Sequence, residues 1–166
     1  MIRLVLALLL AGTAQAQDTV DGLKHPFHDP FIEQLTGDWT LTRQIRGKQA
    51  TNTVHAEWVL NHQFLELHMK DIAQPPAYEA LVYIGYQNAD QRYVAHWMDV
   101  WGGKFSAIGY GRRTGDSIEF AFQYDDGPFF NTFAWDGVAH GWTFKMESSD
   151  KEGTRSPFAV DTLRRK

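Results

Sequence analysis

The chain contains no cysteine among its 166 residues. No disulfide can therefore support the fold, and no thiol is available as a nucleophile or a metal ligand. The sequence also lacks a Gly-x-Ser-x-Gly elbow and a His-Glu-x-x-His pair. Its glycine-rich stretches, Gly102-Gly103 and Gly109-Tyr110-Gly111, have neither the spacing of a phosphate-binding loop nor a helix pattern after them. No enzyme motif is present.

Basic clusters and long apolar runs are absent as well. The chain has 16 Lys and Arg against 20 Asp and Glu, a net charge of −4 with neutral histidines. This balance argues against nucleic acid as a partner. The apolar run from Leu4 to Ala11 is too short to span a bilayer, which needs about 20 residues, and no later run approaches it. We therefore expect no membrane span.

The apolar run at the start has the layout of a secretory signal peptide. Arg3 precedes it, and Ala14-Gln15-Ala16 provides an A-x-A cleavage site after it. We predict that residues 1–16 are a signal peptide cleaved after Ala16, and that the protein is periplasmic or secreted. The remaining length, about 150 residues, suits one domain.

What the sequence does contain is aromatic side chains, with 11 Phe, 6 Trp and 6 Tyr. Aromatic and β-branched residues favour strands. From Trp39 onward such segments alternate with nine turn signals, which imply about ten strands. The turn signals are Gly47-Lys48, Asn61-His62, Ala73 to Pro76, Asn88-Ala89-Asp90, Gly102-Gly103, Gly115-Asp116, Asp125-Asp126-Gly127-Pro128, Asp136-Gly137 and Asp150 to Gly153.

Short connections make consecutive strands antiparallel neighbours, and a meander of this many twisted strands closes because closure removes exposed edges. We predict an all-β fold, a closed antiparallel up-and-down barrel over 39–166, after an N-terminal segment over 17–38. Within that segment Asp29 suits a helix cap, Pro30 a first helical position and Gly37 a left-handed stop. The pattern predicts a short helix over 30–36 that plugs the barrel.

Alternation of apolar and polar residues assigns the strand faces. In His140 to Glu147 the even positions are large and mostly apolar, so Trp142, Phe144 and Met146 are predicted to point inward. The same pattern predicts three further inward sets, namely Val54, Ala56, Trp58 and Leu60; Leu65, Leu67 and Met69; and Ile118, Phe120, Phe122 and Tyr124.

Gly37-Asp38-Trp39, directly after the predicted helix, resembles the Gly-x-Trp signature of calycin and lipocalin barrels. In those barrels an arginine of the last strand stacks on the tryptophan. The resemblance implies that Trp39 pairs with Arg164 or Arg165 to close one barrel end by a cation–π contact.

Three segments, 78–86, 93–99 and 109–112, resemble an uncharacterised bacterial family of this superfamily, a domain of unknown function. The resemblance supports the calycin or lipocalin-like fold. It implies no activity, because fold alone does not fix function.

The strand around His96 and Asp99 is the densest candidate for chemistry. Alternation places His96 on one face, and Trp97 with Asp99 on the other; either face can be inward. The functional interpretation is a histidine that orients a ligand or a carboxylate at the barrel rim, and the enzyme alternative is a lyase or isomerase that uses an inward His96 as its proton-transfer group. The alternative is a core histidine and an aspartate that hydrogen-bonds the turn.

Arg43 shares its parity with Trp39, so the first strand points its charge inward. A buried arginine needs a carboxylate or an acidic ligand, because an isolated charge is costly in low dielectric. Glu79 is one candidate partner. The two open interpretations are capture of a ligand carboxylate and an internal salt bridge.

Histidines offer two further candidates. His140 precedes the inward face headed by Trp142 and resembles the haem-binding histidine of nitrobindin-like barrels, although its place beside a turn favours exposure. His55, Glu57, Glu66 and His68 are a conceivable zinc set, but the opposite faces of their strands are apolar, which places them on solvent.

The leading hypothesis is an exported barrel that binds a small apolar or amphipathic molecule. Haem is the one cofactor considered, no metal site is expected, and a barrel without ligand is the remaining alternative. Nothing in the sequence indicates an oligomeric state. The candidate ligand-binding residues are Arg43, Glu79, Tyr83, His96, Trp97, Asp99, Phe122, His140 and Trp142.

Overall fold

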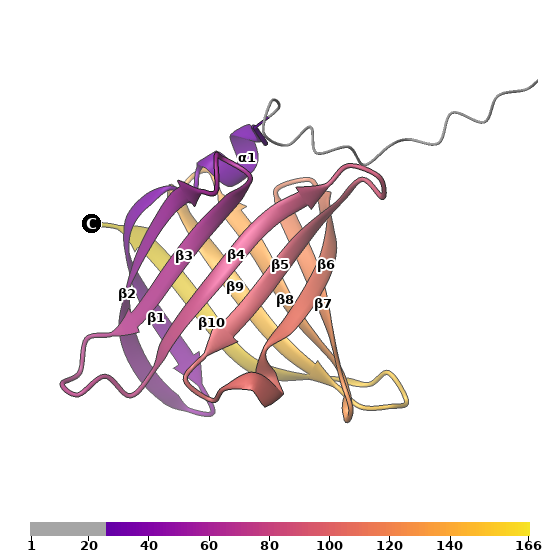
Figure 1. The fold of residues 1–166 in the computed structure, drawn as a ribbon. Helices are drawn as coiled ribbons and strands as arrows, with labels where there is room; N and C mark the ends of the chain where they lie inside the picture. The colour runs from indigo at the N-terminus through magenta and orange to yellow at the C-terminus, as the bar shows by residue number, and fades with distance from the viewer. Residues whose placement is uncertain (1–25) are drawn as a thin grey trace, which may run out of the picture.

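Ten antiparallel strands close into one barrel, with a one-turn helix over one end (Figure 1). The computed structural model describes residues 26–166, so the predicted signal peptide lies outside the described residues. The elements are α1 (Pro30–Glu33), β1 (Gly37–Ile45), β2 (Lys48–Val59), β3 (Phe64–Asp71), β4 (Glu79–Gln87), β5 (Arg92–Asp99), the 3₁₀ turn η2 (Gly103–Phe105), β6 (Ala107–Thr114), β7 (Ser117–Tyr124), β8 (Gly127–Asp136), β9 (Gly141–Ser149) and β10 (Arg155–Arg165).

Each strand pairs with its neighbours in sequence, and β1 pairs with β10 to complete the ring. The predicted all-β, up-and-down barrel of ten strands is therefore confirmed, and the calycin-like description is compatible with it. Each of the nine turn signals overlaps a connection between consecutive strands. Within residues 26–166, no helix has the length and apolar character needed to cross a bilayer.

The helix α1 fills the end of the barrel at which β1 begins. Asp29 caps it by accepting a hydrogen bond from the Phe31 amide (2.8 Å). The helix is shorter than predicted and ends at Glu33, because the amides of Leu35 and Thr36 bond three residues back instead of four. Phe31, Ile32 and Leu35 are fully buried, so this end of the barrel is closed.

At the same end, Arg165 stacks on Trp39. The guanidinium carbon lies 4.4 Å from the centre of the indole, and its nitrogens donate to the carbonyls of Gln34 and Thr36. Gly37 adopts φ +101°, and a Cβ there would lie 2.9 Å from Arg165. Arg164, the other arginine considered, donates to the carbonyl of Leu163 instead.

The predicted inward sets are mostly buried, but Tyr124 of β7 and two residues at the end of β2 are not fully buried. Leu60 is 69% exposed and Trp58 is only partly buried. The prediction for Leu60 is wrong because the chain leaves the strand there: Leu60, Asn61 and His62 all have positive φ, which ends the alternation.

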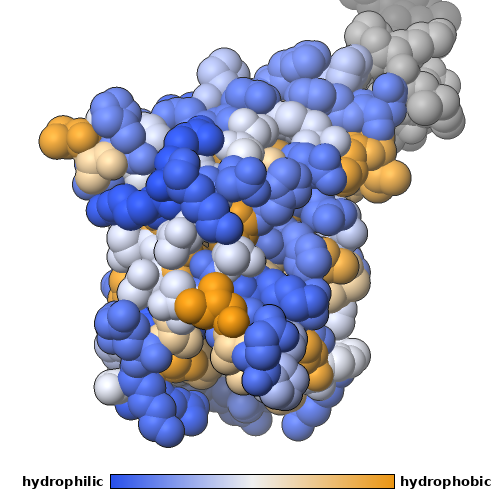
Figure 2. Space-filling view, turned by 90° about the vertical axis from the view of Figure 1, so that its left-hand side faces the viewer, coloured by the Kyte–Doolittle hydropathy of each residue, from blue (hydrophilic) through white to orange (hydrophobic). Residues whose placement is uncertain are grey.

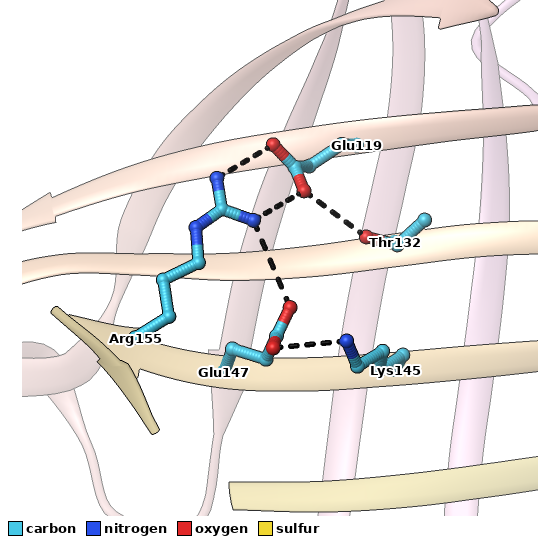
Figure 3. A network of polar contacts seen from close by, with 5 residues as sticks. All are labelled: Glu119, Thr132, Lys145, Glu147 and Arg155. Atoms are coloured by element: carbon cyan, nitrogen blue, oxygen red, sulfur yellow. Dashed lines mark hydrogen bonds and ion pairs between the residues drawn. The ribbon is translucent and has the colours of Figure 1, made fainter. Parts of the chain in front are cut away.

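The outer surface of the barrel is predominantly polar over β1, β2 and β10, where Figure 2 shows hydrophilic side chains with scattered apolar ones. Across β7 to β10 the outer face carries an ion-pair network (Figure 3). Arg155 makes two hydrogen bonds to Glu119, at 2.7 and 2.9 Å, and also faces Glu147, which pairs with Lys145 at 2.9 Å. Such pairs on the outer face are ordinary cross-strand contacts of a sheet that borders solvent.

Candidate ligand-binding site

The half of the barrel away from α1 encloses a cavity of about 880 Å³. Its wall is formed by inward side chains of β1, β5, β7, β8, β9 and β10 together with the connections at that end. Exposed residues such as Trp101 and Asp126 belong to the lining, so the cavity has a mouth on solvent. The opposite half is packed: the rings of Phe133 and Phe144 stack there at 3.9 Å.

Eight of the 22 residues that line the cavity are aromatic. They contact one another edge to face, as Phe129 does with Phe158 at 5.3 Å and with Tyr124 at 6.5 Å. Phe122 lies flat over Gly109, where a Cβ would approach its ring to 2.7 Å. The wall residues follow from the alternation along each strand, which points every second side chain inward, as in Phe122 and Tyr124 of β7.

The floor of the cavity is polar. Arg43 donates from Nε and Nη2 to the two carboxylate oxygens of Asp161, at 2.7 and 2.6 Å, and both side chains are buried. Burial opposes the charge of the guanidinium, but the hydrogen bonds and charge of Asp161 raise the pKa of Arg43. The guanidinium also lies 4.8 Å from the ring centre of Tyr78. Arg43 therefore lines the cavity and forms an internal salt bridge with Asp161.

Glu79 is not the partner of Arg43, and this expectation is wrong. In β4 the residues Ala80 and Val82 point inward, so Glu79 points outward. There it accepts a hydrogen bond from His68 at 2.6 Å and pairs with Lys70 at 3.2 Å. The hydrogen bond from His68 lowers the pKa of the Glu79 carboxyl.

A second polar group of the floor is Asn131 of β8. It is 1% exposed, it lines the cavity, and its Oδ1 has no hydrogen-bond partner among the described residues. A buried polar atom without a partner costs about 1–3 kcal/mol. Sequence reasoning missed both Asn131 and Asp161. Each interrupts an inward apolar alternation, Phe129 to Phe133 and Ala159 to Leu163, and this interruption is the signal that identifies them.

The structure decides which face of β5 is inward. Trp97 and Asp99 point into the barrel, and Trp97 Nε1 donates to the hydroxyl of Tyr78 at 3.3 Å. Asp99 lies at the mouth and accepts from the amide of Trp101 (3.0 Å). His96 is on the outer face, where its Nε2 lies 3.1 Å from Ser106 Oγ. It has no contact with the cavity, so the lyase or isomerase hypothesis loses its proton-transfer group.

Three other candidates lie away from the cavity. His140 is exposed in the turn before β9, with φ +46°, and its ring contacts Trp135. Tyr83 is on the outer face of β4, where its hydrogen bond with Glu66 raises its pKa. Trp142 is fully buried at the closed end and packs on Phe31 at 5.0 Å. The cavity therefore brings together Arg43, Trp97, Asp99 and Phe122 from the predicted set, and its described lining contains no histidine.

The residues of the conceivable zinc set are paired across outer strand faces. His55 is opposite His68, and Glu57 is opposite Glu66. His55 bonds Asp38 at 2.8 Å. Over residues 26–166 no group of three or more His, Asp or Glu side chains is arranged to hold a metal ion.

Comparison with known proteins supports the architecture. No family model matches the chain, and no curated protein matches it. Seventeen chains of solved structures match, among them the crystal structure of Rv2717c from M. tuberculosis. That structure superposes with a TM-score of 0.57 at 13% sequence identity, over 84% of this chain and 99% of that one. A likeness at this identity shows the fold alone.

Proposed function

We propose that this barrel is an exported, calycin-like binding protein that holds a small, mostly apolar molecule in the cavity opposite α1. The observation that supports the proposal is the cavity itself, about 880 Å³ with an aromatic wall and a polar floor. Ligand sites of about 300–1,000 Å³ with apolar walls and a few placed polar groups are typical of proteins that bind small molecules.

The contrast between the two halves of the barrel supports a binding role over a purely structural one. Small barrels commonly fill their interiors with side chains, and the half near α1 does so with Phe120, Phe133 and Phe144. The other half retains space next to Asn131, whose buried Oδ1 has no partner among the described residues. A ligand that donates to this oxygen removes the cost of leaving it unpaired.

Titration with the neutral dye Nile red tests the proposal, because the dye fluoresces in apolar surroundings and Trp97 reports on the cavity. We expect saturable binding with one site per chain. Ser148→Trp, which adds a ring inside the cavity, abolishes it; Ser117→Trp, on the outer face near the other end, leaves it unchanged. Binding that survives Ser148→Trp and is lost in Ser117→Trp contradicts the proposed site.

Native mass spectrometry on protein purified from its own host complements the dye. A reproducible bound mass that is absent from Ser148→Trp supports the proposal. A chain that is consistently free of ligand and also fails to bind Nile red supports the structural barrel instead.

A further inference from the structure

Three carboxylates surround the mouth of the cavity. Asp99 is the last residue of β5, Asp126 lies between β7 and β8, and Asp150 lies between β9 and β10, so the acids come from three separate parts of the chain. Asp99 and Asp150 each use one oxygen for a turn, accepting from the amides of Trp101 and Thr154. Within residues 26–166, the second carboxylate oxygen of each accepts no hydrogen bond from the protein and remains available to a ligand.

The cations of the lining do not balance these acids. Arg43 is neutralised by its two hydrogen bonds to Asp161, which lies behind it. Arg46, at the mouth, is the other cation among the described lining residues. Three carboxylates therefore face a single uncompensated guanidinium, and the mouth has an excess of negative charge.

The aromatic wall favours the same sign of ligand charge, because the face of an aromatic ring attracts a cation. The protein's own guanidiniums already use two of these faces: Arg43 lies 4.8 Å from the ring centre of Tyr78 and Arg46 lies 5.5 Å from that of Phe158. The charge of Asp99 also reaches the interior. Burial is the largest cause of the raised pKa of both Tyr78 and Tyr124; the charge of Asp99 raises both further, whereas the charge of Arg43 lowers that of Tyr78.

Asn131 is an independent indication of a ligand. Its side chain is buried and lines the cavity, and its Oδ1 lacks a donor among the described residues. Because Arg43 and Asp161 already neutralise each other at the polar floor, a further full charge at this depth would be uncompensated. The group that meets Asn131 is therefore an uncharged donor, such as a hydroxyl or amide N–H.

We propose that the ligand is an organic cation, with an ammonium-type charge between the mouth carboxylates and the aromatic wall and an uncharged hydrogen-bond donor reaching Asn131. This inference rests on the proposed binding function and adds the charge and polarity of the ligand. It excludes carboxylates and phosphates as preferred ligands, since the mouth repels them.

A set of probes of similar shape tests the sign of the charge. Benzyltrimethylammonium, its uncharged isostere neopentylbenzene and the anion 3-phenylpropanoate are compared by displacement of Nile red. We expect the cation to bind about tenfold more tightly than the isostere, a ratio within the range of cation–π and ion-pair contacts, and the anion to bind least. Added salt lowers the preference, because the mouth is open to solvent.

Variants then assign the preference to the mouth. The double variant Asp99→Asn with Asp126→Asn reduces the ratio of cation to isostere affinity to below about threefold. Asp116→Asn, an exposed acid in the turn between β6 and β7 at the other end, keeps the wild-type ratio. Asn131→Leu weakens choline relative to tetramethylammonium, which has no hydroxyl.

The outcomes separate the two proposals. Equal binding of the cation and its isostere, or tightest binding of the anion, overturns the charge inference while Nile red binding still supports a cavity site. Failure of Nile red and of all three probes to bind overturns the binding function and this inference with it. An unchanged ratio of cation to isostere affinity in the double variant also overturns the charge inference, because the preference for the cation then does not arise from the mouth carboxylates.

Discussion

Arg43 and Asp161 face each other across the strand pair that closes the barrel. They are register partners on β1 and β10, 118 residues apart in sequence, and both guanidinium–carboxylate hydrogen bonds are shorter than 2.8 Å. The first and last strands are therefore joined inside the barrel by a charged pair as well as by their backbone ladder. The pair is buried, so its two halves depend on each other.

Loss of one half of this pair destabilises the fold. Asp161→Asn leaves the Arg43 charge buried without compensation, and we expect the free energy of unfolding to fall by about 3–5 kcal/mol. Urea denaturation followed by tryptophan fluorescence measures this. The double variant Arg43→Met with Asp161→Leu recovers at least about half of the loss, because it removes both charges. A double variant as unstable as Asp161→Asn would contradict the mutual dependence of the Arg43 and Asp161 charges.

The closed end of the barrel depends on Arg165 and not on its neighbour. Arg165→Ala removes the stacking on Trp39 and two hydrogen bonds to carbonyls after α1, and we expect a loss of about 1–2 kcal/mol. Arg164→Ala is the matched control and changes stability by less than about 0.5 kcal/mol. Thermal unfolding of the two variants under one condition compares them. Equal effects would show that the stacking contributes nothing specific.

The pair of His55 and Asp38 has a defined pH dependence. The hydrogen bond that the His55 imidazole donates to the Asp38 carboxylate raises the pKa of His55 above its ordinary value of 6.5. A raised histidine pKa stabilises the fold below pH 6.5, and this contribution disappears as the pH rises through the folded-state pKa. We expect the imidazole resonances of His55 to titrate above 6.5 by NMR and to move back towards that value in Asp38→Asn. A His55 titration unaffected by this substitution would show that the pair does not form in solution.

The predicted export of the protein depends on residues 1–16, which lie outside the described residues, and it can be tested directly. The layout of residues 1–16 predicts a mature chain that begins at Gln17. Fractionation of the host followed by mass spectrometry of the intact chain checks both place and terminus. A chain that keeps Met1 and remains in the cytoplasm would contradict the prediction, and Ala16→Trp, which blocks small-residue cleavage, should retain the leader.

Much of the fold is visible in the sequence because its information is local. Turn residues recur between aromatic segments, so the strand count follows, and alternation gives most faces correctly from Leu65 to Met69 and from Ile118 to Phe122. Alternation fails where the backbone turns. By alternation, Leu60 and His140 belong to the inward-pointing positions of their strands. In the structure both have positive φ and are exposed.

The site was harder to predict because its partners are distant in sequence. The inward charge of Arg43 follows from parity, but its partner depends on the register of β1 against β10, which no local pattern supplies. Glu79 is a carboxylate that the sequence offers for Arg43, but the parity of β4 places it on the outer face. For β5, alternation correctly places His96 on one face and Trp97 with Asp99 on the other. Both faces carry apolar residues, so alternation does not determine which face is inward.

The position of the chain end determines how this barrel can be attached to something else. The amide of Lys166 bonds the carbonyl of Asp38, so the C-terminus lies beside the start of β1, at the end sealed by α1 (Figure 1). A tether fused after Lys166 therefore holds the molecule by its sealed base and leaves the mouth pointing outward. Immobilisation through this terminus orients every barrel with its cavity mouth towards the solution, which suits measurements of ligand capture under flow.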